Sequence, residues 1–245
     1  PAADDPAVAL PLLPYYDATG IRLPDALDDA HGVAGIDRYR ATLAHIAGHR
    51  RWSQSMFADN FSPMQRLAIE FFEDSRIETL ILRQYPGLRR VFLALHPRPV
   101  EGACNPETHS CLRHRLAMLS RALLDPQHGY RDAALGEFVD RFVRTMASGE
   151  SSSEQIAELA LAYVARTRRQ SDQLASVYFA DTVIDYRDDN RHLWRFHELS
   201  DDEEMFDGPP PAAAPSEVER LPPRHYPEQD YQSQSYPPDW DSLYK

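Results

Sequence analysis

Four side chains of the kinds that bind zinc lie within eleven residues of one another: Cys104, His109, Cys111 and His114. Thiolate sulfurs and imidazole nitrogens are the usual ligands of a tetrahedral zinc ion. The spacing differs from that of zinc fingers and ribbons, and a structural thiol or a crowded polar loop would need no metal. We therefore favour a group that holds no metal, with zinc binding as the alternative. A disulfide between Cys104 and Cys111 is expected even less than zinc binding, because we expect a reducing compartment.

A second group combines two histidines with a run of acids further along the chain. His45 and His49 are four residues apart, so they share one face of a helix. They could bind a metal with Glu73 or Glu70 facing them, as in helical carboxylate sites. We favour ion pairing instead, because adjacent arginines would repel a cation. The paired acids would be Glu73, Asp74 and Glu78, and their arginine partners would be Arg50, Arg51 and Arg76.

A third group, residues 185–192, is dense in acids, arginines and an asparagine, and includes Asp188, Asp189 and Arg191. Its oxygens could hold Ca²⁺ or Mg²⁺, but the order of ligands and the central glycine of an EF-hand are missing. The arginines among the acids favour a salt-bridged turn. The chain also has no phosphate-binding loop, dinucleotide fingerprint, zinc-protease motif or nucleophile elbow. The sequence therefore predicts no catalytic residue.

Helices are needed to position these groups, and apolar residues recur at every third or fourth position through the middle of the chain. The pattern predicts an all-α helical bundle. Ser62 with Gln65, and Ser152 with Gln155, are capping boxes that should start two of the helices. A short apolar stretch occupies residues 88–95. The predicted helices span residues 36–57, 62–85, 110–124, 131–148, 153–169 and 171–186.

Charge divides the chain into parts. The net charge is −12, but residues 36–198 carry 21 acids and 22 bases, so the acidity lies at the two ends. We expect an acidic N-terminal arm over residues 1–35 and a helical body over residues 36–198. An acidic, proline-rich linker should follow over residues 199–224, and an aromatic connector over residues 225–245.

Composition also limits the class of protein. A net charge of −12 argues against nucleic-acid binding, which needs a basic face. No run of eighteen apolar residues occurs, so no membrane span is expected. Two cysteines make no disulfide framework, which favours a reducing, cytoplasmic location.

Several stretches together resemble the region that precedes the von Willebrand factor A domain in the NorD/CbbO family. The resemblance covers most of residues 36–245, and the motifs occur in the family's order. The stretches are Phe72–Glu78, Tyr85–Arg90, Asp185–Phe196 and Tyr226–Trp240.

The resemblance implies an adaptor for a hexameric MoxR-type AAA+ ATPase, which itself hydrolyses the ATP. The CbbO branch activates rubisco by releasing inhibitory sugar phosphates, and we favour this branch over the NorD branch, which is linked to nitric oxide reductase. The family's A domain carries an Asp-x-Ser-x-Ser site for Mg²⁺, and no such motif occurs here. We therefore expect a fragment that leads into an absent A domain.

The resemblance also changes the interpretation of the acidic and basic groups. We expect them to form either a partner-binding surface or a structural ion network in an adaptor body. The residues concerned are Glu73, Asp74, Arg76, Glu78, Asp188, Asp189, Arg191 and Arg195. No catalytic residue and no cofactor of this segment is implied, and a metal-binding helical module remains the alternative from a different class.

Overall fold

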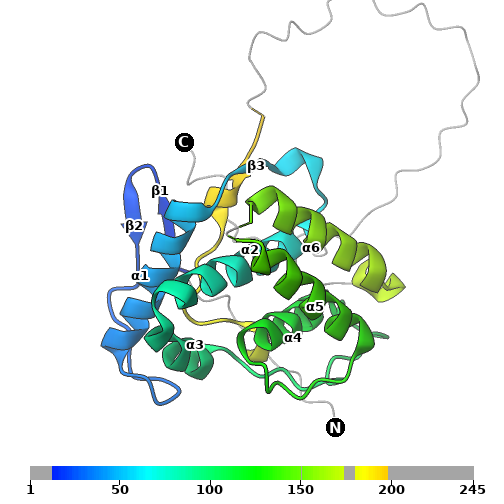
Figure 1. Ribbon diagram of the computed structural model, residues 1–245, viewed down its shortest axis with the longest axis horizontal. Helices are drawn as coiled ribbons and strands as arrows, with labels where there is room; N and C mark the ends of the chain where they lie inside the picture. Colours follow the sequence, from blue (N-terminus) through cyan, green and yellow to red (C-terminus); the bar gives the residue numbers. More distant parts are fainter. Residues whose placement is uncertain (1–12, 150, 174–179, 198–245) are drawn as a thin grey trace, which may run out of the picture. The chain divides into compact units, whose positions relative to one another are not determined.

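The computed structural model describes residues 13–149, 151–173 and 180–197, and this part of the chain is mostly helical (Figure 1). The all-α prediction is confirmed at this level. The predicted linker and connector lie outside the described residues. The helices are α1 (Gly35–Trp52), α2 (Pro63–Gln84), α3 (Arg89–Leu95), α4 (Leu112–Leu124), α5 (Ala133–Ala147) and α6 (Ser153–Thr167).

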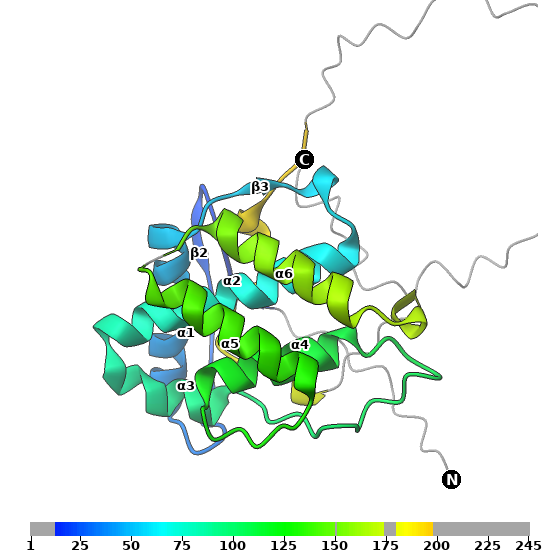
Figure 2. The same ribbon diagram turned by 45° about the vertical axis from the view of Figure 1, so that its right-hand side comes forward.

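Helix α2 is the core of the bundle. It packs against α1, α4 and α6, and Figures 1 and 2 both show α6 lying along it. Thirteen of its 22 residues are buried, including charged ones. The predicted capping box is present, because Ser62 accepts from the backbone N–H of Gln65 and the Gln65 side chain bonds back to Ser62. Tyr85 and Pro86 end the helix.

Helices α1 and α2 approach each other closely at Gly48. A Cβ atom there would lie 2.4 Å from Cγ2 of Ile77 and 2.9 Å from Cδ1 of Ile81. Only glycine leaves room for this contact. Ile77 and Ile81 share a helix face with Asp74, so the same face of α2 presents a carboxylate to α1.

The N-terminal segment is folded, which corrects the prediction of an arm over residues 1–35 for the part that the structure describes. Strands β1 (Tyr15–Asp17) and β2 (Gly20–Arg22) form an antiparallel hairpin with Tyr15 opposite Arg22. Backbone N–H of Asp189 donates to the Pro14 carbonyl over 3.0 Å. The Tyr39 hydroxyl donates to the Pro24 carbonyl over 2.7 Å. Local acidity therefore did not prevent this segment from packing.

The predicted helix over residues 171–186 is wrong within the described residues. Short 3-10 helices span Gln170–Gln173 (η3) and Ala180–Thr182 (η4), and residues 183–186 are not helical. Asp172 accepts from Arg115 and from the backbone N–H of Arg169, which holds the chain in a tight turn. The ring of Tyr186 instead stacks on Phe92 of α3, with centroids 4.4 Å apart.

The remaining elements connect the chain's later residues to the loop before α2. Helix α1 ends before the predicted residue 57, and strand β3 (Met56–Phe57) pairs in parallel with β4 (Trp194–Arg195). Further 3-10 helices are η1 (Ala58–Asn60), η2 (Pro86–Leu88) and η5 (Arg191–Leu193). No helix among the described residues is long and apolar enough to cross a membrane.

Candidate functional site

Two histidines of α1 face a carboxylate of α2 in the interior. His45 Nε2 lies 3.0 Å from His49 Nε2, and the two nitrogens lie 3.4 Å and 3.1 Å from Oδ1 of Asp74. A carboxylate oxygen of Asp188 completes a set of four ligand atoms that lie within 4.8 Å of one another. We call His45, His49, Asp74 and Asp188 the His/Asp cluster. All four residues are buried, with exposed fractions of 3% or less.

Local structure explains why these residues meet. His45 and His49 are one turn apart on α1, and the close approach at Gly48 brings their face against α2. Asp188 comes from a turn in which Asn190 adopts a left-handed conformation, with φ of 58°. Asparagine tolerates this conformation better than most residues. Its side-chain amide donates to Oδ2 of Asp74 over 3.3 Å, which joins the turn to α2.

Arg187 pairs with two acids of α2. Its Nη1 lies 3.2 Å from Oδ2 of Asp74, and its Nε donates to Glu78 over 2.8 Å. The same guanidinium also donates to Ser120 of α4. Removing one partner of such a buried pair leaves an uncompensated charge. Arg187 therefore holds residues 185–196 against α2.

A second network lies beside the His/Asp cluster. Glu73 accepts two bonds from Arg76, at 2.6 and 2.9 Å. Ser53 and Ser153 also donate to Oε1 of Glu73, over 2.6 and 2.8 Å. Ser53 in turn lies 2.8 Å from Nδ1 of His49. Glu73 thus supports the His/Asp cluster through Ser53 instead of facing its centre.

The electrostatic environment changes the acidity of the cluster. Burial lowers the pKa of His49, but the negative charges of Asp188 and Asp74 outweigh it and raise that pKa overall. Burial opposes ionisation of Asp74, yet Arg187 and the two histidines hold its pKa well below the usual range. Burial raises the pKa of Asp188. Burial and the charge of His49 lower the pKa of nearby His192 to about 2.

The residues expected to bind a partner or form an ion network separate into two sets. Glu73, Asp74, Arg76, Glu78 and Asp188 are buried within the networks described above, so they present no surface to a partner. Asp189 pairs with Arg191 over 2.6 Å near the surface. Arg195 is exposed, and its guanidinium lies 4.6 Å from the ring centroid of Phe57.

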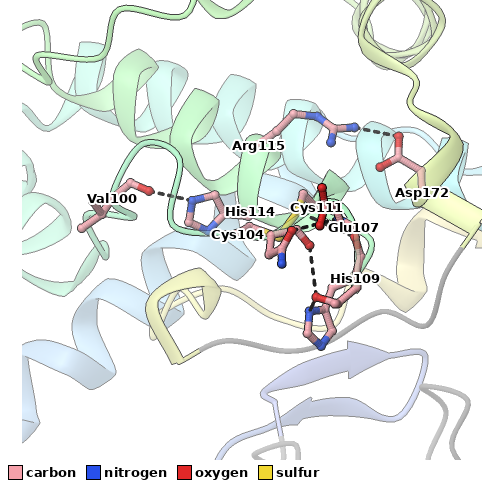
Figure 3. Close-up of a disulfide and its surroundings, with 10 residues drawn as sticks. Val100, Cys104, Glu107, His109, Cys111, His114, Arg115 and Asp172 are labelled. Carbon is pink, nitrogen blue, oxygen red and sulfur yellow. Dashed lines mark hydrogen bonds and ion pairs between the residues drawn. A yellow bond between two sulfur atoms is a disulfide. The ribbon is translucent and has the colours of Figure 1, made fainter. Parts of the chain in front are cut away.

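The first group of candidate ligands, Cys104 to His114, does not assemble into a zinc site. The order of the alternatives expected from the sequence, with the disulfide last, was wrong. Cys104 and Cys111 form the disulfide that had been least expected, which leaves neither sulfur as a thiolate ligand (Figure 3). His114 donates through Nε2 to the Val100 carbonyl over 2.9 Å. Figure 3 shows the His109 ring pointing away from the sulfurs. Nδ1 of this ring lies 2.7 Å from the hydroxyl of Thr108.

This disulfide also weakens one inference from composition. Disulfides are typical of oxidising compartments, so a low number of cysteines no longer favours a cytoplasmic location by itself. That location stays a prediction.

The third group does not form an oxygen site of its own. Asp185 forms a bidentate pair with Arg38, at 2.7 Å for each bond, and Asp189 binds Arg191. Only Asp188 turns to the histidines. All four cluster residues were therefore candidates from the sequence, but they belonged to two separate groups. The acids expected to face the histidines were Glu73 and Glu70, not Asp74.

Three supporting roles were missed: that of Ser53 beside His49, that of Asn190 toward Asp74, and that of His192, a residue of the third group whose ring centroid lies 4.4 Å from that of His49. One pattern in the sequence could have indicated the position of Asp74. Asp74, Ile77 and Ile81 lie on one helix face, and the two apolar residues of that face had to pack against a neighbouring helix. No local pattern signals Ser53 or His192.

Comparison of the chain with family models, with curated proteins and with solved structures gave no match. The function therefore has to be proposed from the residues and their geometry.

Proposed function

We propose that this chain is the helical body of a NorD/CbbO-type adaptor, which couples a MoxR-type AAA+ ATPase to a client protein. The favoured client is rubisco, activated by removal of inhibitory sugar phosphates, and activation of nitric oxide reductase is the alternative. In this proposal the chain acts in the cytoplasm and carries no catalytic residue. The ATPase supplies the energy.

The observation that supports the proposal is the direct contact between two stretches that carry the family resemblance. Arg187 in Asp185–Phe196 pairs with both Asp74 and Glu78 in Phe72–Glu78, across more than a hundred residues of sequence. Trp194 donates to Glu70, two residues before that stretch, over 2.7 Å. Contact between the two stretches is what a shared family core would require.

A third stretch of the resemblance, Tyr85–Arg90, supplies the candidate contact surface. It includes the turn between α2 and α3, and Tyr85 is 60% exposed. Arg90 is exposed as well. Exposed aromatic and arginine side chains are enriched where proteins bind one another. In this proposal Tyr85 and Arg90 contact the ATPase or the client.

The test is reconstitution of the protein with its cognate MoxR-type ATPase. We expect co-purification and stimulation of ATP hydrolysis, and at least a tenfold weaker complex for Tyr85→Ala combined with Arg90→Glu. Val100→Ala is the control, because Val100 is 66% exposed but lies outside the stretches that resemble the family. An ATPase that neither binds nor responds to the wild-type protein contradicts the proposal.

The identity of the client needs a separate measurement. We expect inhibited rubisco to regain activity when the protein, its ATPase and ATP are all present. Activation of nitric oxide reductase in the same format, with no effect on rubisco, would select the alternative client while leaving the adaptor role intact.

A further inference from the structure

We propose that the His/Asp cluster binds one divalent transition-metal ion, zinc in the first place, as a closed structural site. The ion would fasten the segment around Asp188 to helices α1 and α2. This inference goes beyond the adaptor function and does not depend on it.

The distances fit a tetrahedral ion. Bonds of about 2.0–2.1 Å to nitrogen and oxygen place neighbouring tetrahedral ligand atoms about 3.3 Å apart. Nε2 of His45, Nε2 of His49 and Oδ1 of Asp74 are separated by 3.0, 3.1 and 3.4 Å. Asp188 closes the site with a small side-chain movement. Its Oδ2 lies 3.6 Å from Nδ1 of His192 and has no hydrogen-bond partner among the described residues, so that movement breaks no hydrogen bond made by this atom.

The arrangement of protons also calls for a cation. The Ser53 hydroxyl has one proton, and it is donated to Glu73 over 2.6 Å. The contact between Ser53 and His49 must then use the Nδ1–H of His49 as donor. A neutral His49 therefore turns an Nε2 lone pair toward Oδ1 of Asp74 and toward His45. Nε2 of His49 and Oδ1 of Asp74 are then both acceptors, and a cation between them, either a proton or a metal ion, has to satisfy both.

The charges in the interior lead to the same conclusion. Glu73 and Arg76 neutralise each other. Asp74, Glu78 and Asp188 carry three negative charges, and Arg187 is the positive charge paired with two of them. With neutral histidines, this leaves an excess of two negative charges in a region without solvent, which is costly. One divalent ion restores neutrality.

One proton, on Nε2 of His49, would serve Asp74 and His45 but leave one negative charge in excess and Oδ2 of Asp188 without a hydrogen bond among the described residues. A proton on each histidine would balance the charge but not the geometry. Two Nε2–H groups would then point at each other across 3.0 Å, and neither could accept. A metal ion accepts both lone pairs at once. The surrounding bonds also match those of metal sites, where outer residues orient the ligands. Ser53 orients His49, while Arg187 and Asn190 hold the second oxygen of Asp74.

The choice of ion follows from the ligands. Two imidazoles with two carboxylates suit zinc, whereas Ca²⁺ and Mg²⁺ prefer sets of six or more oxygens. Four protein ligands and complete burial leave no position for a substrate, so the site is structural. Its ligands come from segments as far apart in sequence as His45 and Asp188, and the ion would therefore add directly to the stability of the fold.

The first experiment measures metal in the full chain, purified without added metal and without a polyhistidine tag. We expect about one equivalent of zinc per chain by elemental analysis, and a fall in melting temperature of at least about 5 °C after removal by a chelator. Less than about a tenth of an equivalent, together with no binding when zinc is titrated into the chelated protein, overturns the proposal.

A matched pair of variants locates the ion. Asp188→Asn removes a ligand charge at nearly constant size, and Asp189→Asn makes the same change at the neighbouring acid, which pairs with Arg191 outside the cluster. We expect Asp189→Asn to keep about one equivalent and Asp188→Asn to bind zinc at least tenfold more weakly. Equal zinc binding in the two variants overturns the proposal.

Cobalt substitution keeps the proposal testable if Asp188→Asn fails to fold. Co²⁺ in the wild-type protein should give the visible absorption bands of a tetrahedral site without a thiolate-to-cobalt charge-transfer band. A thiolate band would place the metal at Cys104 and Cys111 in reduced protein and overturn the assignment to the cluster.

Discussion

The His/Asp cluster and the Cys104–His114 segment each combine two histidines with two further metal-ligand side chains, carboxylates in the cluster and thiols in the segment, but they assemble them in opposite ways. The cysteines and histidines of the segment are neighbours in sequence, yet the two sulfurs bond to each other and the rings of His109 and His114 turn to other partners. The cluster draws its ligands from α1, α2 and a distant turn. In the cluster, rigid helices bring together ligands that are distant in sequence. In the segment, closeness in sequence did not orient the ligands toward a common centre.

The largest expected effect tests the buried network beside the cluster. Arg187→Met should destabilise the protein by about 3–5 kcal/mol, because Asp74 and Glu78 would remain buried without their cation. Arg98→Met is the control, since Arg98 pairs with Asp125 from a side chain that is 74% exposed, and it should cost less than about 1 kcal/mol. Urea denaturation gives both values. Similar losses of unfolding free energy in the two variants would mean that the buried network contributes no more stability than an exposed ion pair.

The cysteine segment should show a smaller effect. Replacing both cysteines by serine opens a short loop, which costs about 2 kcal/mol of unfolding free energy by the chain-entropy relation. The measurement is denaturation of the two proteins under oxidising conditions. Under reducing conditions the difference should nearly vanish. A difference that persists with reductant would show that the thiols, not their bond, stabilise the segment.

The close approach of α1 and α2 gives a further test. Gly48→Ala should cost about 1–3 kcal/mol, because the new methyl group overlaps Ile77 and pushes the histidines away from Asp74. Gly136→Ala in α5 is the matched control, as its Cβ would meet nothing within 4 Å, and it should stabilise by about 0.5–1 kcal/mol. Thermal melts of the two variants should therefore shift in opposite directions. A neutral Gly48→Ala would contradict the tight helix contact.

Much of the helical body could be predicted from the sequence, for identifiable reasons. Ser62 and Ser152 begin α2 and α6 with the expected capping boxes, since the local hydrogen bonds suffice there. The helix prediction for residues 171–186 was wrong within the described residues because Asp172 and Tyr186 bind partners that lie far away in sequence, namely Arg115 and Phe92. Tertiary contacts outweighed helical propensity at this point.

The residues of the His/Asp cluster could be predicted from the sequence, but their arrangement in space could not. The spacing of His45 and His49 was enough to place them on one helix face. Their pairing with Asp188 depends on the turn at Asn190 and on the ion pairs of Arg187, and neither leaves a local pattern. The disulfide was missed because two cysteines in a long chain favoured a reduced state on composition alone.

The smallest effect concerns Glu70, whose carboxylate accepts from Trp194. Burial, opposed by that hydrogen bond and aided by the charge of Asp74, raises the pKa of Glu70 from 4.5 to about 7. The folded state thus binds the proton more tightly than the unfolded state, so stability present below pH 4.5 is lost as the pH rises to 7. Glu70→Gln should remove this slope and stabilise the protein at pH 8 by about 1 kcal/mol. This is less than the full pKa change would give at about 1.4 kcal/mol per pH unit, because the amide accepts a weaker hydrogen bond from Trp194 than the carboxylate does.

The control for this prediction is Glu137→Gln, because Glu137 is a half-exposed acid of α5 whose ion-pair distances are 3.7 and 3.9 Å. It should leave the slope unchanged. Denaturation midpoints measured from pH 4 to pH 8 compare the three proteins. A Glu70→Gln variant with the wild-type slope would assign the pH dependence to another group.

Zinc content of the double variant Cys104→Ser/Cys111→Ser, compared with the wild-type protein, tests the contrast between the two regions most directly. If the metal is held by the His/Asp cluster, both proteins should carry about one equivalent, since none of the ligands is a cysteine. Zinc that is present in the wild-type protein and lost from the double variant would place the metal at the cysteines and contradict the assignment.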